Sequence, residues 1–170
     1  MEYTDVKCEY PCSSVSKAEF SKGSFRLYDD HSEYFIFNGD FHKTNGPAIY
    51  IWRNKYGLKR IEEYFIKGVM HRSDGPARIY YYSSQKLEFE HWVINGELHR
   101  VGEPAVLSYY SSGAKRSEEY YIRGELHNEN GPASIHYDRY GKLRKTYYCL
   151  DGKSYSKKDY DKKKSVKLYW

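Results

Sequence analysis

The stretch Asn95-Gly96-Glu97-Leu98-His99-Arg100, followed by Pro104-Ala105, carries the phrase that decides the fold. Its elements are a glycine, a hydrophobic residue, a histidine, a short polar loop and proline–alanine. The phrase occurs four times, and a partial fifth copy begins at Gly152. The histidines are 29, 28 and 28 residues apart, at His42, His71, His99 and His127. A fixed period of this length indicates a repeat architecture.

Glycine, histidine and proline recur at the same places in every unit. We predict that these residues shape turns and packing, because a role in chemistry would require one special set. The structural repeat set is Gly39, His42, Pro47, Gly68, His71, Pro76, Gly96, His99, Pro104, Gly124, His127 and Pro132. The pair Asn95-Gly96 is also a strong signal for a two-residue hairpin turn.

The segments between the turns show alternation with a period of two residues. In the second unit Ile79 and Tyr81 follow the proline–alanine at every second position, and the other units repeat this pattern. Such alternation predicts a strand with one face more buried than the other. A second strand precedes each turn glycine. It carries a glutamate on the same face as its aromatic residues, at Glu33, Glu62, Glu90 and Glu118.

Each unit is therefore expected to contain two strands and two turns. The predicted fold is all-β, an elongated single-layer antiparallel β-meander of hairpin repeats. Neighbouring strands lie about 4.8 Å apart, so each unit advances the array by about 10 Å. Hydrophobic residues make up only 39% of the chain, whereas aromatic residues reach 18% with 21 tyrosines. This composition favours a thin sheet with aromatic ladders over a thick apolar core.

The chain divides into three parts. Residues 1–19 form an N-terminal segment without a clear pattern, and residues 20–155 form an array of about four and a half repeats of 28–29 residues. Residues 156–170 form a basic C-terminal cap or tail. Ser156 is a predicted N-cap, and we expect a short helix after it to cover the edge of the last strand.

The net charge of +5 is concentrated in the tail. Residues 153–170 contain seven lysines and two aspartates, and the rest of the chain is balanced. A localised basic segment serves an anionic membrane, nucleic acid or an acidic partner, or it is a solvated end that aids solubility. The candidate interaction residues of the tail are Lys157, Lys158, Lys162, Lys163 and Lys164.

Three tyrosines, Tyr80, Tyr82 and Tyr110, lie on or next to the mixed face of the predicted strands and are further candidate interaction residues. Exposed rings stack on bases or sugars. They are also favoured where proteins meet. The balanced charge of the repeat body favours contact with another protein.

Cysteine usage and the chain start bear on the compartment. For Cys8 and Cys12 three states remain open: two free thiols, a disulfide within the local loop, or a disulfide to another molecule. Cys149 occupies a position that packing residues hold in the other repeats. Three cysteines do not make a disulfide framework, which favours a reducing compartment. The start has no signal-peptide pattern, and no apolar run approaches the roughly 20 residues of a membrane helix. We expect an intracellular protein that is neither secreted nor transmembrane.

The repeated polar residues do not form a predicted reaction centre. Equivalent histidines lie about 10 Å apart, too far to share a zinc ion that needs ligands at about 2.0–2.3 Å. We expect each imidazole to fix a turn through the backbone or a glutamate, and each glutamate to pair with histidine, arginine or backbone. Catalysis by paired carboxylates needs one special pair across a cleft. We therefore expect no enzyme activity, cofactor, metal or small-molecule substrate.

These features resemble the MORN-repeat family in the variant form of giant DNA viruses of amoebae (Marseillevirus-like). The resemblance rests on the phrase at residues 95–105 with its tyrosine-rich and glutamate–aromatic strands, and it covers about residues 32–155. The standard MORN unit is shorter and richer in glycine, and its Tyr-x-Gly start is absent here.

The resemblance implies an elongated scaffold that is often dimeric and has no catalytic residues. A viral origin would place the protein in the host cytoplasm, the virus factory or the virion. The predicted function is a self-associating, homodimeric protein-interaction module. The alternative is a peripheral adaptor that binds anionic lipid, or nucleic acid, through the basic tail.

Overall fold

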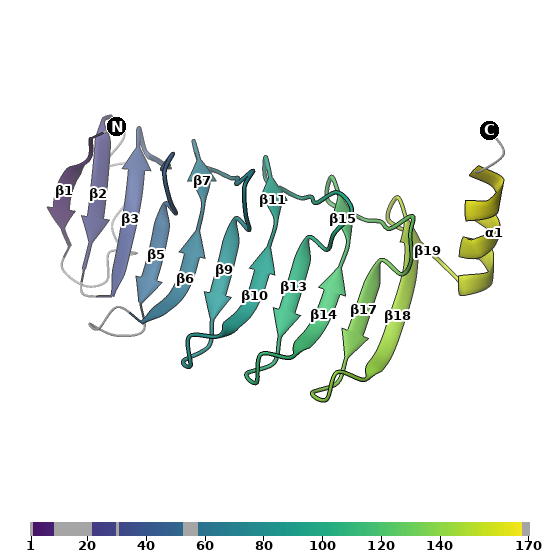
Figure 1. Ribbon diagram of the computed structural model, residues 1–170. Coiled ribbons are helices and arrows are strands. Elements are labelled where there is room, and N and C mark those ends of the chain that lie inside the picture. Colours follow the sequence, from purple (N-terminus) through teal and green to yellow (C-terminus); the bar gives the residue numbers. More distant parts are fainter. Residues whose placement is uncertain (1, 9–21, 30, 53–57, 168–170) are drawn as a thin grey trace.

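The computed structural model describes residues 2–8, 22–29, 31–52 and 58–167, and it has the shape of a long row of strands with a helix at one end (Figure 1). The prediction of an all-β array of hairpins is confirmed. A 13-stranded sheet runs along the molecule, and β4 (Asp40–Phe41) pairs beside its main path. The path is β1 (Thr4–Lys7), β2 (Ser24–Tyr28), β3 (Ser32–Phe37), β5 (Ile49–Trp52), β6 (Lys59–Glu63), β9 (Arg78–Tyr81), β10 (Leu87–His91), β13 (Val106–Tyr109), β14 (Lys115–Glu119), β17 (Ser134–Tyr137), β18 (Leu143–Leu150) and β19 (Lys153–Tyr155).

The N-terminal end departs from the meander. Strand β1 pairs with β2 in parallel, with Val6 opposite Leu27, although residues 1–19 show no strand pattern in the sequence. Leu27 and Ile36 are each 2% exposed and form a small apolar cluster with Val6 and Phe25. The first strand therefore closes this end of the array by covering apolar side chains.

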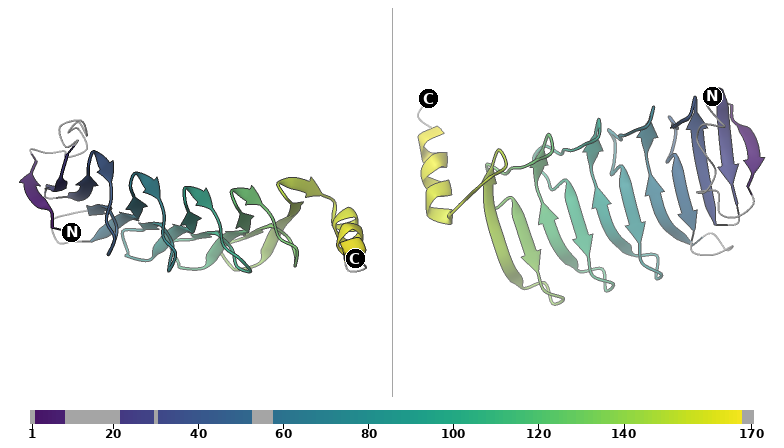
Figure 2. Two further views of the ribbon diagram at one scale, coloured as in Figure 1. Left: turned by 90° about the horizontal axis from the view of Figure 1, so that it is seen from above. Right: turned by 180° about the vertical axis from the view of Figure 1, so that it is seen from behind.

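The second strand of the middle units bends and does not run straight to the turn. Three short hairpins follow the bends and form a second row on one side of the main sheet (Figure 2). They are β7 (Phe65–Ile66) with β8 (Val69–Met70), β11 (Val93–Ile94) with β12 (Glu97–Leu98), and β15 (Tyr121–Ile122) with β16 (Glu125–Leu126). The continuous second strand expected from the sequence is present in β3 and β18.

One residue in each unit bonds two backbone partners where the short hairpin begins. Trp92 donates its N–H to the carbonyl of Ala105 in the next unit at 2.7 Å, and its carbonyl accepts the N–H of His99 at 3.0 Å. Tyr64 and Tyr120 make the equivalent pairs of bonds. Phe35 also makes this pair, with Ala48 and His42, although β3 is continuous, so the bonds link the hairpin to the main sheet without by themselves requiring a bend.

The hairpin turns have two consecutive residues with positive φ. Asn95 and Gly96 have φ of 51° and 84°, and Lys67 with Gly68 has 49° and 76°. This is the conformation of a type I′ turn, which matches the twist of the flanking strands. The prediction that these glycines shape turns is therefore confirmed.

The interior is thin, and alanine occupies its closest approach. The alanine after each proline is 0% exposed, at Ala48, Ala77, Ala105 and Ala133. Each donates its N–H to the neighbouring strand, as Ala105 does to the Glu119 carbonyl at 2.9 Å. A methyl group fits here because two backbones lie close together, so the unit packs mainly against its neighbours.

Helix α1 (Lys157–Lys167) follows the last strand and stands beside β18 and β19 (Figure 1). The predicted N-cap is confirmed, because Ser156 Oγ accepts the Asp159 N–H at 3.2 Å. Tyr160 attaches the helix to the array and is 2% exposed. Its hydroxyl donates to the Asn128 carbonyl at 2.8 Å and accepts the Gly131 N–H at 3.0 Å. In the described ranges, no helix combines the length and apolar character needed to cross a membrane.

Candidate interaction surface

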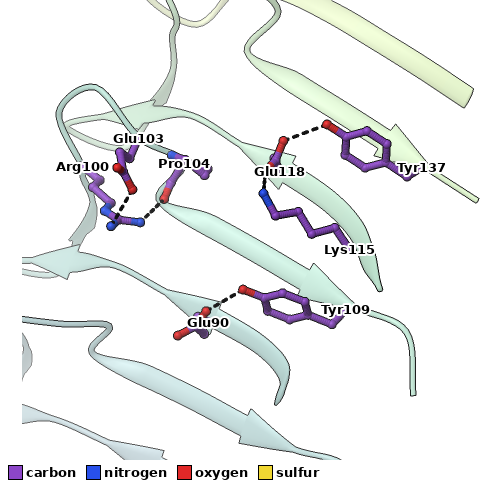
Figure 3. A network of polar contacts seen from close by, with 8 residues as sticks. All are labelled: Glu90, Arg100, Glu103, Pro104, Tyr109, Lys115, Glu118 and Tyr137. Carbon is purple, nitrogen blue, oxygen red and sulfur yellow. Dashed lines mark hydrogen bonds and ion pairs between the residues drawn. The ribbon is translucent and has the colours of Figure 1, made fainter. Parts of the chain in front are cut away.

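A ladder of tyrosines and glutamates connects successive repeats on one face of the main sheet. The Tyr109 hydroxyl donates to Glu90 Oε2 at 2.9 Å, and Tyr137 donates to Glu118 Oε2 at 2.9 Å (Figure 3). Tyr81 donates to Glu62 Oε1 at 3.3 Å. We call this side the tyrosine–glutamate face, defined by Glu62, Tyr81, Glu90, Tyr109, Glu118 and Tyr137. Each contact joins a tyrosine to the glutamate 19 residues earlier, so each ties one repeat to the next.

Two of these glutamates also have a lysine partner. Lys59 pairs with Glu62, and Lys115 pairs with Glu118 (Figure 3). Leu87 stands at the corresponding position before Glu90, so among the described residues Tyr109 is the hydrogen-bond partner on which that carboxylate depends. The half-buried setting of Glu90 makes this partner important, since desolvating an unpaired carboxylate is costly.

The phenols of the ladder are held in their protonated form. Burial, followed by the hydrogen bond to Glu118, raises the pKa of Tyr137 to about 12. Burial and the Glu90 hydrogen bond also raise the pKa of Tyr109. A neutral phenol is the form that donates to a carboxylate, so these shifts agree with the direction of the bonds.

The first glutamate of the series has a different partner. Arg26 Nε donates to Glu33 Oε1, and Arg26 Nη1 lies 3.3 Å from Asp5 Oδ2. The expectation that glutamates pair with arginine is thus met at Glu33, while tyrosine and lysine take that role further along the array. The tyrosines recur 19 residues after the glutamates in the sequence, but the pairing of neighbouring units decides that these side chains meet.

Cations lie over aromatic rings at the loops that border this face. The Arg100 guanidinium carbon is 3.7 Å from the Trp92 ring centre, and that of Arg72 is 4.1 Å from the Tyr64 ring centre. Arg100 Nη1 also donates to the Pro104 carbonyl at 3.3 Å, and Arg100 Nη2 lies 2.8 Å from Glu103 Oε2 (Figure 3). These contacts fix the loop against the sheet, and the nearby carboxylate offsets the positive charge.

Two open pockets lie between neighbouring repeats. One of about 370 Å³ is lined by Arg100, Glu103, Leu107, Tyr109 and Glu118 among others. Another of about 440 Å³ lies between the loops of the first two repeats. In the first of these, every ionic group is already engaged by a neighbour of the protein itself. The polar groups that line this pocket therefore bond to one another and hold neighbouring repeats together.

The histidine of each repeat accepts a bond from the turn of the following repeat. His99 Nδ1 accepts the Arg123 N–H at 3.1 Å, and His42 Nδ1 accepts the Lys67 N–H at 3.1 Å. His71 and His127 repeat this contact at 3.1 Å. The imidazole thus fixes a turn through the backbone, as predicted, and the turn belongs to the next unit. Burial, helped by the Lys67 charge, lowers the pKa of His42 and favours its neutral form.

The three tyrosines proposed for interaction are partly used inside the array. Tyr82 donates its hydroxyl to the Tyr109 carbonyl at 2.8 Å, and Tyr110 donates to the Tyr137 carbonyl at 2.9 Å. Tyr80 stacks on Phe89 with 4.2 Å between ring centres. All three are half-buried, so each leaves only part of its ring for a partner.

The opposite face of the sheet is mixed and has contacts of its own. Arg78 Nε donates to Glu63 Oε1 at 2.8 Å, and the Ser108 and Ser117 hydroxyls lie 2.6 Å apart. Tyr121 of the short hairpin β15 donates to Glu119 at 3.1 Å. The start of the hairpin β15 therefore contacts this face of the sheet.

The tail lysines keep their exposure in the helix. Lys157, Lys158, Lys162, Lys163 and Lys164 are all exposed. Lys157 Nζ pairs with Asp161 at 2.7 Å, and Lys163 Nζ lies 4.9 Å from the Tyr155 ring centre. Lys158 and Lys162 are two residues on either side of the buried Tyr160, which places them on the outer side of the helix.

The cysteines are separated along the array. Cys8 is half-buried beside the N-terminal apolar cluster, and Cys149 is buried at the packing position that the sequence indicated. Cys12 lies outside the described residues, so the Cys8–Cys12 disulfide stays a prediction. Among the residues with described positions, no group of three or more histidine, cysteine, aspartate or glutamate side chains is arranged to hold a metal ion.

Large hydrophobic side chains are exposed at several places along the array. Tyr140 is 87% exposed, Leu143 54% and Tyr147 39%, and all three belong to β18 or the turn before it. Val101 at 77%, Val69 at 45% and Leu58 at 37% lie in other repeats. The C-terminal edge of the sheet thus carries three exposed apolar side chains that are close in sequence.

No protein-family model, curated protein or solved structure matches this chain.

Proposed function

We propose that this protein is a non-enzymatic interaction module, an elongated scaffold built from MORN-like repeats that associates with itself. One observation carries the proposal. The polar side chains that recur in every repeat are engaged in contacts between repeats, as shown by the Tyr109–Glu90 and His99–Arg123 bonds. Because these side chains are used to hold successive repeats together, they maintain an elongated array whose long surface is available to a partner.

The exposed apolar residues support self-association. Tyr140, Leu143 and Tyr147 lie together in sequence at the C-terminal end of the array and remain open to solvent. Exposed aromatic and aliphatic side chains that gather in one region are typical of protein interfaces. We propose a homodimer, and the viral setting and intracellular location suggested by the sequence belong to the same proposal.

The test is the molar mass in solution, measured by light scattering after size exclusion with and without reductant. A dimer that survives reductant is the expected result. A dimer that is lost on reduction would instead assign the contact to the cysteines, with Cys8 and Cys12 as the first to replace. A monomer in both conditions would contradict self-association.

A second candidate function is a peripheral adaptor for anionic lipid. It is favoured by the outward position of Lys158 and Lys162 on α1, where no acidic partner engages them among the described contacts. Flotation with vesicles containing phosphatidylserine tests it. The variant Lys158→Glu/Lys162→Glu should abolish binding while leaving the array folded, and unchanged flotation would remove this candidate. Binding of nucleic acid by the same lysines would show a steep loss of affinity with salt.

A further inference from the structure

Strand β18 has an edge that the equivalent interior strands do not have. Strands β6, β10 and β14 each pair with a strand on both sides. Strand β18 pairs with β17 over Leu143–Tyr147, but with β19 only over Tyr148–Leu150. Within the described part of the chain, residues 143–147 have no strand on the side away from β17.

The backbone of this edge is oriented to receive a strand. The Tyr147 carbonyl accepts the Ala133 N–H at 2.7 Å, so the polar groups of Tyr147 face β17. Successive residues of a strand alternate in direction, so the N–H and C=O of Thr146 face outward. At the same position of the interior strands, Glu62, Glu90 and Glu118 lie opposite Ile79, Leu107 and Ile135 of the next unit.

Helix α1 leaves this part of the edge open. The helix stands beside the upper end of β18, near β19, while the lower end of β18 extends past it toward the turn with β17 (Figure 1). Residues 142–145 are all exposed, and Leu143 is 54% exposed. The cap predicted from the sequence therefore covers only the upper part of the edge.

The side chains of the edge do not match those of an interior strand. Thr146 replaces the glutamate that would accept the tyrosine of a following repeat. Three cations line the edge, at Lys142, Arg144 and Lys145. Arg144 Nε lies 3.2 Å from Asp138 Oδ2, and Lys142 also interacts with this carboxylate, to which its backbone N–H donates at 3.0 Å. If another repeat of the same kind were added at this edge, its tyrosine would find no glutamate to bond.

The charge also selects the occupant. Two copies of this edge paired strand to strand would bring two sets of cations together, which disfavours main-chain pairing of the edge with itself. The proposed homodimer would therefore use the exposed side chains of this region and not its main-chain edge. An acidic segment would neutralise them. We propose that the free edge of β18 is a docking site for an extended acidic segment of another protein, which adds to the sheet as an antiparallel strand. This inference rests on the proposed function as an interaction module.

The register specifies the segment. The residue opposite Thr146 is apolar, as Ile135 is opposite Glu118, and acidic residues lie opposite Lys145 and near Lys142. Main-chain bonds to an exposed edge provide the affinity, and the alternating side chains provide the specificity. Leu143 lies opposite Tyr137 and shares the face of Thr146, whereas Tyr147 shares the face of Lys145, whose Nζ lies 4.5 Å from the Tyr147 ring centre.

A synthetic fluorescent peptide, Glu-Glu-Ala-Glu-Ile-Glu-Tyr-Glu, tests the proposal by anisotropy titration of the full chain. The variant Thr146→Pro removes the outward N–H but no bond to β17, because proline is tolerated on the open side of an edge strand. The matched control Thr146→Val keeps the N–H. We expect Thr146→Pro to weaken binding at least tenfold and Thr146→Val to leave it within twofold.

A second variant keeps the test decisive if Thr146→Pro fails to fold. Lys142→Glu/Lys145→Glu reverses two charges on a strand that stays intact, and it should also weaken binding at least tenfold. No binding to the native protein, or equal binding by all variants, would overturn the proposal.

Light scattering on the same samples separates this inference from the function on which it rests. A dimer that binds no peptide would overturn the docking site alone. A monomer that binds the peptide would contradict self-association and support docking. A dimer that becomes monomeric with Thr146→Pro would show that a second copy occupies the edge, which overturns the proposal of an acidic partner.

Discussion

Removing the Tyr109 hydroxyl tests whether the tyrosine–glutamate ladder stabilises the array. Tyr109→Phe leaves the ring in place and deletes the donor that lies 2.9 Å from Glu90 Oε2. A hydrogen bond to a charged group contributes about 1.5–3 kcal/mol, and Glu90 has no lysine in the place of Lys115. We therefore expect the free energy of unfolding to fall by about 2 kcal/mol.

Tyr137→Phe is the matched control. Glu118 keeps its ion pair with Lys115 when the Tyr137 hydroxyl is removed, so its carboxylate is not left alone. We expect a loss of about 1 kcal/mol, at the lower end of the range for hydrogen bonds. The difference between the two variants comes from the partner that remains.

Urea denaturation followed by circular dichroism measures both effects. The slope of the free energy of unfolding against urea concentration should stay unchanged, so that a shift of the transition midpoint reports a change in stability. In a double-mutant cycle, Tyr109→Phe should cost much less in a Glu90→Gln background, with a coupling of about 1 kcal/mol. The reasoning is refuted if Tyr109→Phe costs no more than Tyr137→Phe, or if the coupling is zero within error.

Three further predictions concern the turns and the helix. Because the pKa of His42 is lowered, the stability that its neutral imidazole contributes is fully present above the usual histidine pKa near 6.5 and is lost as the pH falls through the folded-state pKa. His42→Asn should therefore reduce the loss of stability on acidification, measured by thermal melts at pH 7 and pH 5. Gly96→Ala should lower the free energy of unfolding by about 1–2 kcal/mol, because φ at this position is 84°. Gly131→Ala is the control: the nearest atom lies 3.9 Å from the added carbon, so the loss in urea titrations should be below about 0.5 kcal/mol. Tyr160→Phe should speed amide hydrogen exchange in α1 and leave the middle repeats unaffected, and equal exchange would contradict a tether through this hydroxyl.

The candidate interaction residues show how far local reasoning extends. Tyr82 and Tyr110 stand near the mixed face in the sequence, and period-two alternation gives no reason to expect a partner for them. Their hydroxyls reach carbonyls 27 residues later, in the next unit. Only the placement of one unit against the next brings these groups together, so the pattern within a unit could not predict it.

The sequence by itself determined the repeat, its turns and its strands, because these depend on nearby residues. Asn95-Gly96 specifies a tight turn, alternation around Ile79 specifies a strand, and Ser156 specifies a helix start. The tertiary structure alone decided the Tyr109–Glu90 contact, the bend at Trp92 and the parallel pairing of β1. These features depend on the register between strands from different units. That register is set when neighbouring backbones pack together, and not by the order of residues within one strand.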